Sequence, residues 1–272
     1  MTAQEIISEI LRQSGFSEPL DFPTCDRMIA GDAGRDVKRI LCTFMATAGV
    51  IRTAIDRNAD MIITHEPTWF SGSDETGWLT GDPVYDRKQK LLRDSGLVIW
   101  RYHDTMHGAK GGDRIYQGVD LQFGWGGYRM ENQGFPGICY EIPETSLEKL
   151  CGFFREMTGM KTIRMIGSPE MTVRKAAVLV GGGSLGLGDE TSPMKLMRDL
   201  DIDVAICGDI TEWTLPAYIR DASQLGLNKA AIILGHERSE ECGMRFLVPW
   251  LREIMPGVEI EFADAGEPFQ YL

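Results

Sequence analysis

Apolar runs typical of buried strands alternate along this chain with amphipathic segments of helical period. The first helix is expected to begin at a capping box formed by Thr2 and Glu5. In the first half of the chain the pattern predicts strands at 37–46, 60–65 and 97–103 and helices at 48–59 and 82–96. Because each strand is followed by a helix and then another strand, the pattern indicates parallel pairing through βαβ crossovers.

A segment rich in glycine and aromatic residues, 121–137, interrupts this alternation and indicates a domain boundary. Beyond it, a second capping box is expected at Thr145 and Glu148. The later pattern predicts strands at 138–142, 161–167, 175–181, 203–209, 229–236 and 258–264 and helices at 147–159, 192–200, 213–226 and 240–255. The fold class is therefore α/β with two lobes, one formed by 1–126 plus 236–272 and a middle lobe formed by 127–235.

Composition narrows the choice of function. The chain has 272 residues and a formal net charge of -12, which argues against binding to nucleic acid phosphates. It contains no apolar run of about 18 residues and no signal-peptide pattern, so no membrane association and a cytoplasmic location are expected. The six cysteines form no CxxC pair, and we interpret them as small core residues, in preference to ligands or disulfides.

The positions of the four histidines point to a shared site. His65, His103 and His236 each follow an apolar strand-like run, His107 comes four residues after His103, and none lies in a predicted helix. A single histidine in such a place is usually only a polar turn residue. In α/β sheets, however, ligands bind at the carboxyl ends of strands, and four histidines together favour one common site.

Carboxylates accompany these histidines. Glu66 follows His65, Asp104 follows His103, and Glu240 lies four residues after His236, on the same face if the segment is helical. Imidazole and carboxylate together are the donor set of Zn, Mn, Fe or Co. The donors are too many for one tetrahedral structural zinc, so two ions bridged by a carboxylate and about 4 Å apart fit better.

Three short motifs carry a resemblance to a known family. They are ITHEP (63–67), HDTMHGAKGGD (103–113) and GHERSE (235–240), and a strand end of the type Gly208-Asp209 accompanies them. On these motifs the chain resembles the Nif-three-like dinuclear metal-centre family, the homologues of type 2 GTP cyclohydrolase I. The resemblance extends over nearly the whole chain.

The resemblance implies metal ligands at His65, His103, His236 and Glu240. Glu66 stands where the family has a second histidine, and His107 stands where it has an aspartate. The two changes exchange an imidazole and a carboxylate, so the expected ligand set includes both residues and still holds two divalent ions. The resemblance further implies a homo-oligomer, such as a hexameric ring.

Two other features are open to more than one interpretation. The run GGGSLG, 181–186, matches a dinucleotide-binding pattern, but the next predicted helix begins only near 192, which argues against a dinucleotide site. The resemblance implies instead a loop bordering the cleft, whose amides could hold an oxyanion or a phosphate. Glu212 could act as a general base, or Asp209 or Thr211 could simply cap the helix that follows.

The leading hypothesis is a metal-dependent hydrolase whose dinuclear centre activates water, with the metal site in the cleft between the two lobes. Its small-molecule substrate would be a nucleotide or a cyclic amide. The alternative is a metal-binding regulatory or scaffold protein without turnover. A nicotinamide-dependent oxidoreductase would leave every histidine without a role.

Overall fold

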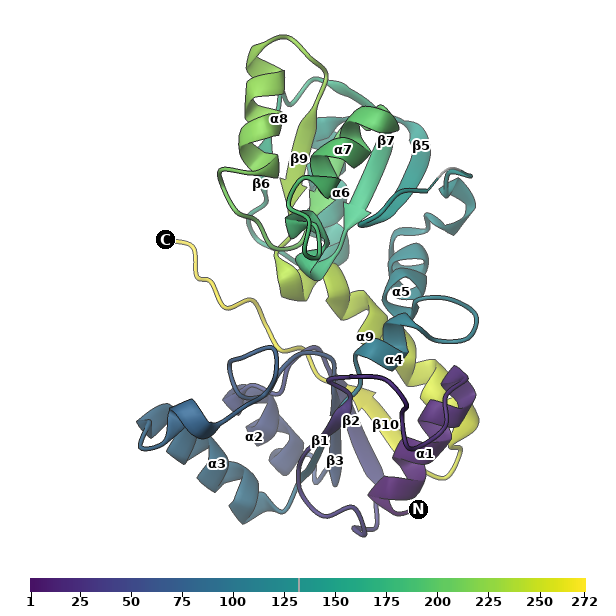
Figure 1. The fold of residues 1–272 in the computed structure, drawn as a ribbon, viewed down its shortest axis with the longest axis vertical. Helices are drawn as coiled ribbons and strands as arrows, with labels where there is room; N and C mark the ends of the chain where they lie inside the picture. Colours follow the sequence, from purple (N-terminus) through teal and green to yellow (C-terminus); the bar gives the residue numbers. More distant parts are fainter. Residues whose placement is uncertain (132) are drawn as a thin grey trace. The chain divides into compact units, whose positions relative to one another are not determined.

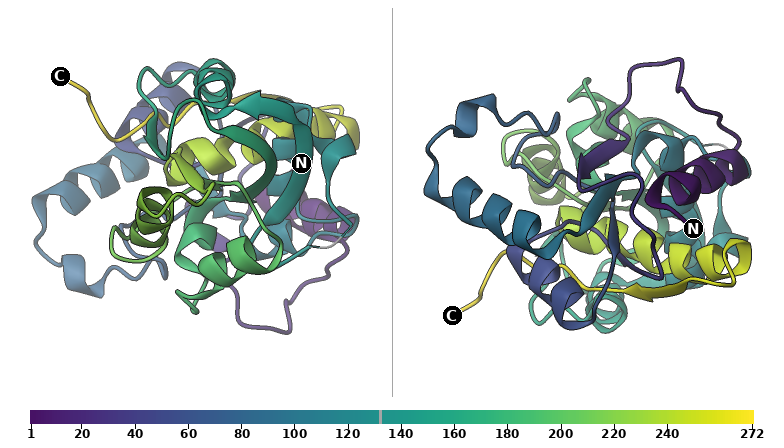
Figure 2. Two further views of the ribbon diagram at one scale, coloured as in Figure 1. Left: turned by 90° about the horizontal axis from the view of Figure 1, so that it is seen from above. Right: turned by 90° about the horizontal axis from the view of Figure 1, so that it is seen from below.

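The computed structural model describes residues 1–131 and 133–272 and divides into two compact units. Unit 1 comprises Met1–Gly118 and Gly243–Gly266, and unit 2 comprises Val119–Cys242 and Glu267–Leu272. Both divisions fall within helices, α5 (Arg114–Phe123) and α9 (His236–Ile254). The sequence placed the boundaries between 126 and 127 and between 235 and 236. Figures 1 and 2 colour the chain by residue number, so that the two segments of each unit can be traced.

Unit 1 is built on a five-stranded sheet with the order β1-β4-β3-β2-β10. Its strands are β1 (Arg27–Ala30), β2 (Arg39–Thr43), β3 (Met61–Thr64), β4 (Val98–Arg101) and β10 (Glu259–Phe262). β10, β2, β3 and β4 run parallel, as the βαβ pattern predicted, and β1 pairs antiparallel with β4. β1 was not predicted because its apolar run, Met28 to Ala30, is short and only partly buried.

Helices cover both faces of the unit 1 sheet (Figure 1). The set is α1 (Ala3–Ser14), α2 (Ala48–Asp56), α3 (Pro83–Ser95), the single turn α4 (Asp104–His107), the 3-10 turn η1 (Gly77–Leu79) and the unit 1 parts of α5 and α9. The predicted capping box of α1 is confirmed, since Thr2 accepts from the Glu5 amide and the Glu5 side chain accepts from the Thr2 amide.

The unit 1 core forms where α2 and α3 pack on the sheet. Leu41, Ile62 and Ile99 come from three neighbouring strands and are fully buried in one cluster with Ile51 of α2 and Leu92 of α3. Each such side chain contributes about 1.5–3 kcal/mol by leaving water. The intervening strand residues point to the other face, where α1 lies (Figure 1). The sheet is thus buried on both faces, and the ends of its strands are where a site can lie.

Unit 2 contains a second five-stranded sheet, with the order β5-β7-β8-β9-β6. Its strands are β5 (Ile138–Ser146), β6 (Arg164–Ile166), β7 (Thr172–Leu179), β8 (Val204–Cys207) and β9 (Ala230–Ile233). β7, β8 and β9 are parallel, whereas β5 and β6 pair antiparallel at the two edges. The carboxyl ends of β7, β8 and β9 therefore lie side by side at the same end of the sheet.

The unit 2 helices begin close to the predicted positions. They are α6 (Leu147–Thr158), α7 (Ser192–Asp199), α8 (Leu215–Gln224) and the first residues of α9, with 3-10 turns η2 (Gly126–Tyr128) and η3 (Gly181–Leu185). The predicted capping box at Thr145 is wrong, because β5 continues through Ser146 and the Ser146 hydroxyl caps α6 at the Lys149 amide. Among the described residues, no helix is long and apolar enough to cross a membrane.

Candidate metal centre

Strand order explains why two distant histidines of unit 1 come together. β3 and β4 are parallel neighbours in register, with Thr64 opposite Arg101. The residues just beyond their carboxyl ends are His65 and, two residues after Arg101, His103. Because parallel strands end at the same edge of a sheet, both imidazoles lie at this edge. The amides of His65 and Glu66 both donate to the Phe44 carbonyl that follows β2, which fixes the loop.

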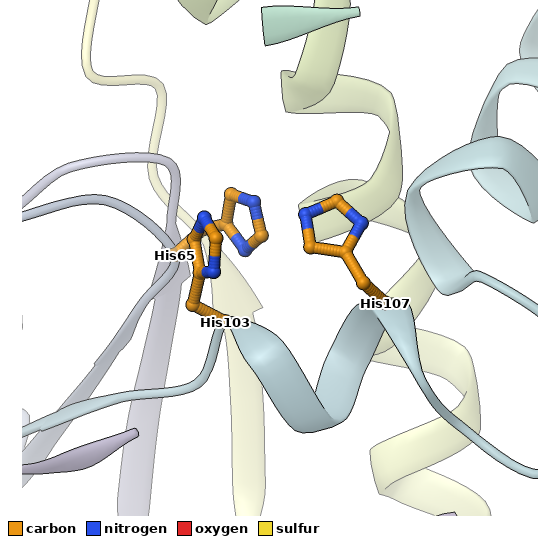
Figure 3. A group of neighbouring side chains, drawn as sticks. All are labelled: His65, His103 and His107. Atoms are coloured by element: carbon orange, nitrogen blue, oxygen red, sulfur yellow. The ribbon is translucent and has the colours of Figure 1, made fainter. Parts of the chain in front are cut away.

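Three imidazole rings form a compact cluster in unit 1 (Figure 3). The ring centroids of His65 and His103 are 4.4 Å apart and nearly parallel, and His107 lies 5.1 Å from His65 and 5.0 Å from His103. His103 and His107 stand at the two ends of the single helical turn α4, which brings both rings to one side. One ring nitrogen from each residue lies within 4.8 Å of the other two.

The prediction that no histidine lies in a helix is wrong. His107 ends α4 and His236 begins α9. α4 is only one turn long, too short for its period to show in the sequence. α9 begins four residues before the predicted start, because the polar run His236–Ser239 shows no apolar face.

Each ring of the cluster is oriented through its Nδ1 atom. Nδ1 of His103 lies 2.9 Å from Asp104, Nδ1 of His107 lies 2.8 Å from Asp113, and Nδ1 of His65 lies 3.2 Å from the carbonyl of Tyr102. Carbonyl and carboxylate oxygens only accept hydrogen bonds, so each Nδ1 carries the proton. In a neutral ring the lone pair is then on Nε2. Metal-binding histidines typically have this arrangement.

Glu66 adds a carboxylate to the cluster. One of its oxygens lies 3.2 Å from Nη2 of Arg101, and the other lies 3.6 Å from Nε2 of His103. Arg101 is itself buried and also donates to the carbonyl of His65. Burial alone would lower the pKa of His103, but hydrogen bonds to Cys25 and Glu66 and the charge of Glu66 outweigh it and raise that pKa to about 11. The surroundings of His103 therefore favour a positive charge.

The buried ring of His65 behaves differently. Its side chain has no exposed surface, and burial together with repulsion from His103 and His107 lowers its pKa well below the ordinary value. A neutral, buried imidazole next to a carboxylate is suited to binding a cation through its lone pair.

Unit 2 places the fourth histidine at the carboxyl edge of its own parallel strands. Nδ1 of His236 lies 2.7 Å from Asp209, which follows β8, and Nε2 lies 3.2 Å from Glu240, one turn along α9. The predicted i, i+4 pairing of His236 with Glu240 is therefore present. Asp209 orients His236 as Asp113 orients His107, so the same device occurs in both units.

The glycine-rich run lies directly beside this pair. Gly181, just after β7, has a positive φ of 49°, and a Cβ atom there would overlap the Glu240 carboxylate and lie 2.8 Å from Nε2 of His236. Its amide donates to the Ser239 hydroxyl at 3.0 Å. The run continues as the 3-10 turn η3 and the helix begins only at Ser192, so it does not form the direct turn into a helix that a dinucleotide site requires.

Glu212, the predicted general base, lies in the loop between β8 and α8. Its side chain is exposed, and no hydrogen bond or ion pair of Glu212 is formed with the described residues. The carboxylates that contact His236 are Asp209 and Glu240. The role of Glu212 stays a prediction.

Sequence reasoning missed Asp113 and Asp26, which lie apart from the histidines that they support. Asp113 ends the motif 103–113, which was its only signal, and Asp26, just before β1, had none.

The donor chemistry of each unit fits a transition-metal ion. Unit 1 supplies three imidazoles whose Nδ1 atoms are oriented and one carboxylate, and unit 2 supplies an imidazole and a carboxylate on one helical turn. Nitrogen and oxygen donors in this proportion suit zinc, manganese, iron or cobalt better than magnesium or calcium. Fold and donors together define a mixed α/β protein with candidate metal-binding groups.

Comparison with known proteins agrees with this class. Residues 5–268 match the sequence profile of Duf34/NIF3 (NGG1p interacting factor 3). The chain therefore belongs to the Duf34/NIF3 family. It is 23% identical over 253 residues to a protein of Clostridium perfringens named GTP cyclohydrolase 1 type 2 homolog, covering 90% of each chain.

Solved structures share the fold. A Bacillus cereus protein related to NIF3 is similar with a TM-score of 0.74 at 16% identity, covering 100% of this chain and 99% of the other. Reduced HcgD from Methanocaldococcus jannaschii is similar with a TM-score of 0.68 at 21% identity, covering 96% and 97%. At these identities the similarity shows the fold alone.

Proposed function

We propose that this protein is a metal-dependent hydrolase with a dinuclear centre, acting on a small molecule such as a nucleotide or a cyclic amide. The proposed ligands are His65, Glu66, His103 and His107 of unit 1 and His236 and Glu240 of unit 2. The observation that carries the proposal is that all four Nδ1 atoms are held by oxygen acceptors, which leaves Nε2 as the metal-binding nitrogen of each ring.

A bound pair of divalent ions would lower the pKa of water and polarise the bond to be hydrolysed. The chain's own side chains would do the rest. Asp104, Asp113 and Asp209 keep their histidines in the right tautomer and orientation. Arg101 holds Glu66 in place through one oxygen and leaves the other near His103. Glu212 is the proposed acceptor of the proton that water loses.

The substrate class follows from the relatives' printed name together with the unit 2 loop. A cyclohydrolase opens a ring at a carbon–nitrogen bond, which suggests a purine nucleotide or another cyclic amide. The amide of Gly182 lies in the glycine-rich loop that begins at Gly181 beside His236, and such a loop can bind an oxyanion or a phosphate.

Metal content is the first test. Protein purified without added metal is expected to carry up to two transition-metal ions per chain by elemental analysis. His236→Ala and Glu66→Gln should each lower that content while the circular dichroism spectrum stays unchanged. Glu75→Gln, at an exposed carboxylate in the same unit, is the matched control and should change nothing.

Turnover is the second test. GTP and simple cyclic amides should be hydrolysed by the metal-loaded protein and not after chelation. Full metal occupancy without turnover on any such substrate would favour the regulatory or scaffold role. A protein that binds none of zinc, manganese, iron and cobalt would refute both.

We also propose that the protein is a homo-oligomer, with a hexamer as the expected state. Unit 2 exposes several large apolar side chains: Trp213 is 79% exposed, Leu225 78% and Leu227 58%. A subunit interface would remove these side chains from water. Light scattering on the eluting protein should give a mass several times that of one chain, and a monomer would contradict the proposal.

A further inference from the structure

A loop of unit 1 is fastened to the start of α4 by its own carboxylate. Asp26 accepts hydrogen bonds from three consecutive backbone amides, those of His103 at 2.7 Å, Asp104 at 2.6 Å and Thr105 at 3.0 Å. These amides have no partner within so short a helix, so Asp26 serves as its cap although it lies almost 80 residues away in sequence. The position of the loop is thereby tied to that of His103.

The contact is reciprocal. Oδ2 of Asp104 accepts from the hydroxyl of Thr24 at 2.8 Å and from the amide of Cys25 at 2.8 Å. Each segment therefore caps the other through a carboxylate, and charge-assisted bonds of this kind are roughly twice as strong as neutral ones. The backbone of Cys25 is held in one place beside the cluster, which a flexible loop would not achieve.

This geometry brings a third kind of donor to His103. Sγ of Cys25, a ring nitrogen of His103 and a carboxylate oxygen of Asp104 lie within 4.8 Å of one another. Ligands around one tetrahedral zinc lie about 3.5 Å apart, given bonds of about 2.0–2.3 Å, so a small closure would bring the sulfur and the histidine nitrogen onto one ion.

The other cysteines have different surroundings. Cys42, Cys139, Cys207 and Cys242 are buried, and Cys151 is half-buried on α6 with its sulfur 3.8 Å from that of Met165. Among the described residues, Cys25 is the cysteine that joins a histidine and a carboxylate in a group able to hold a metal. The core role expected for the cysteines from sequence does not describe this half-buried loop residue.

We propose that Cys25 is a thiolate ligand of the metal ion held by His103. This inference rests on the proposed metal centre and adds to it a soft sulfur donor. Thiolate selects zinc, cobalt or iron over manganese and magnesium, which prefer oxygen. Cys25 would then determine which metal the protein takes up, and Asp104 would serve to place both donors.

Cobalt tests this directly, because thiolate bound to Co²⁺ gives a near-ultraviolet charge-transfer band that nitrogen and oxygen donors do not. Metal-free protein, kept reduced, is titrated with Co²⁺ as wild type, Cys25→Ser and Cys151→Ser. Wild type and Cys151→Ser should show the band, and Cys25→Ser should lose it while still binding cobalt. The affinity for zinc relative to manganese should fall on the order of 10-fold in Cys25→Ser alone.

The outcomes separate this inference from the proposed function. Cobalt binding without the band in wild type, or with the band retained in Cys25→Ser, would overturn the role of Cys25 and leave the metal centre standing. A wild-type protein that binds no cobalt would overturn both. Circular dichroism of the metal-free variants shows that any lost band is not a loss of fold.

Discussion

Asp113 offers a substitution that separates orientation of a metal ligand from stability of the fold. One of its oxygens lies 2.8 Å from Nδ1 of His107. The other accepts from the amides of Ile115 at 2.8 Å and Tyr116 at 3.3 Å, at the start of α5. Asp113→Asn leaves one acceptor oxygen where there were two. The side chain can then cap the helix or hold His107, but not both.

The expected size of each effect follows from these contacts. Asparagine caps helices about as well as aspartate, so the metal-free variant should unfold within a few tenths of a kcal/mol of wild type. Loss of the acceptor at Nδ1 should weaken metal binding about 10- to 100-fold, or about 1.4–2.8 kcal/mol. Asp113→Ala removes both functions and should also lower the free energy of unfolding by about 1 kcal/mol.

A competition titration against a chromophoric chelator measures the metal affinity, and urea unfolding of the metal-free protein measures stability. Asp82→Asn is the matched control. Asp82 caps α3 by accepting from the amides of Val84 and Tyr85, both at 2.9 Å, and has no histidine partner. If Asp113→Asn and Asp82→Asn bind metal equally well, the orienting role of Asp113 is refuted.

Two further outcomes are expected. Burial lowers the pKa of Lys88 from 10.5 to about 8. Below pH 8 the buried charge therefore lowers the free energy of unfolding, and this loss of stability disappears as the pH rises towards 10.5. Urea unfolding should show a gain of about 3 kcal/mol over this range that Lys88→Met lacks, and parallel pH profiles would contradict the reasoning. Gly181→Ala forces a Cβ against Glu240 and His236 and should lower the free energy of unfolding by roughly 1–3 kcal/mol together with metal content. Gly182→Ala, whose added Cβ would meet only Leu187 at 3.3 Å, should have little effect on either measurement.

The parallel strands were the most predictable part of the fold. β2, β3 and β4 are continuous apolar runs buried on both faces, so their pattern is strong in the sequence. β1 was missed, because its short apolar run is only partly buried and the strand is defined by its pairing with β4. α4 was missed, because its cap is Asp26, which no local sequence rule connects with His103.

The site was predictable as residue types and not as contacts. Strand ends indicated His65 and His103, and spacing indicated the pair His236 and Glu240. Asp113 lies six residues from His107, and only the turn between them reveals that the two side chains meet. The contact of Cys25 with His103 depends on two segments brought together by tertiary structure, which a cysteine count cannot show.

The insertion of unit 2 into unit 1 has a consequence for synthesis on the ribosome. β2 is paired on one side by β10, which begins only at Glu259, so this side of the sheet lacks its partner until the segment 119–242 has been synthesised. Most of unit 2, 119–242, emerges before then and can fold first. During that interval the nascent chain presents the open edge of an apolar strand, a surface that favours aggregation and the binding of chaperones. Ribosome-bound chains truncated before residue 259 should accordingly be far more sensitive to protease in 1–118 than chains that extend past β10.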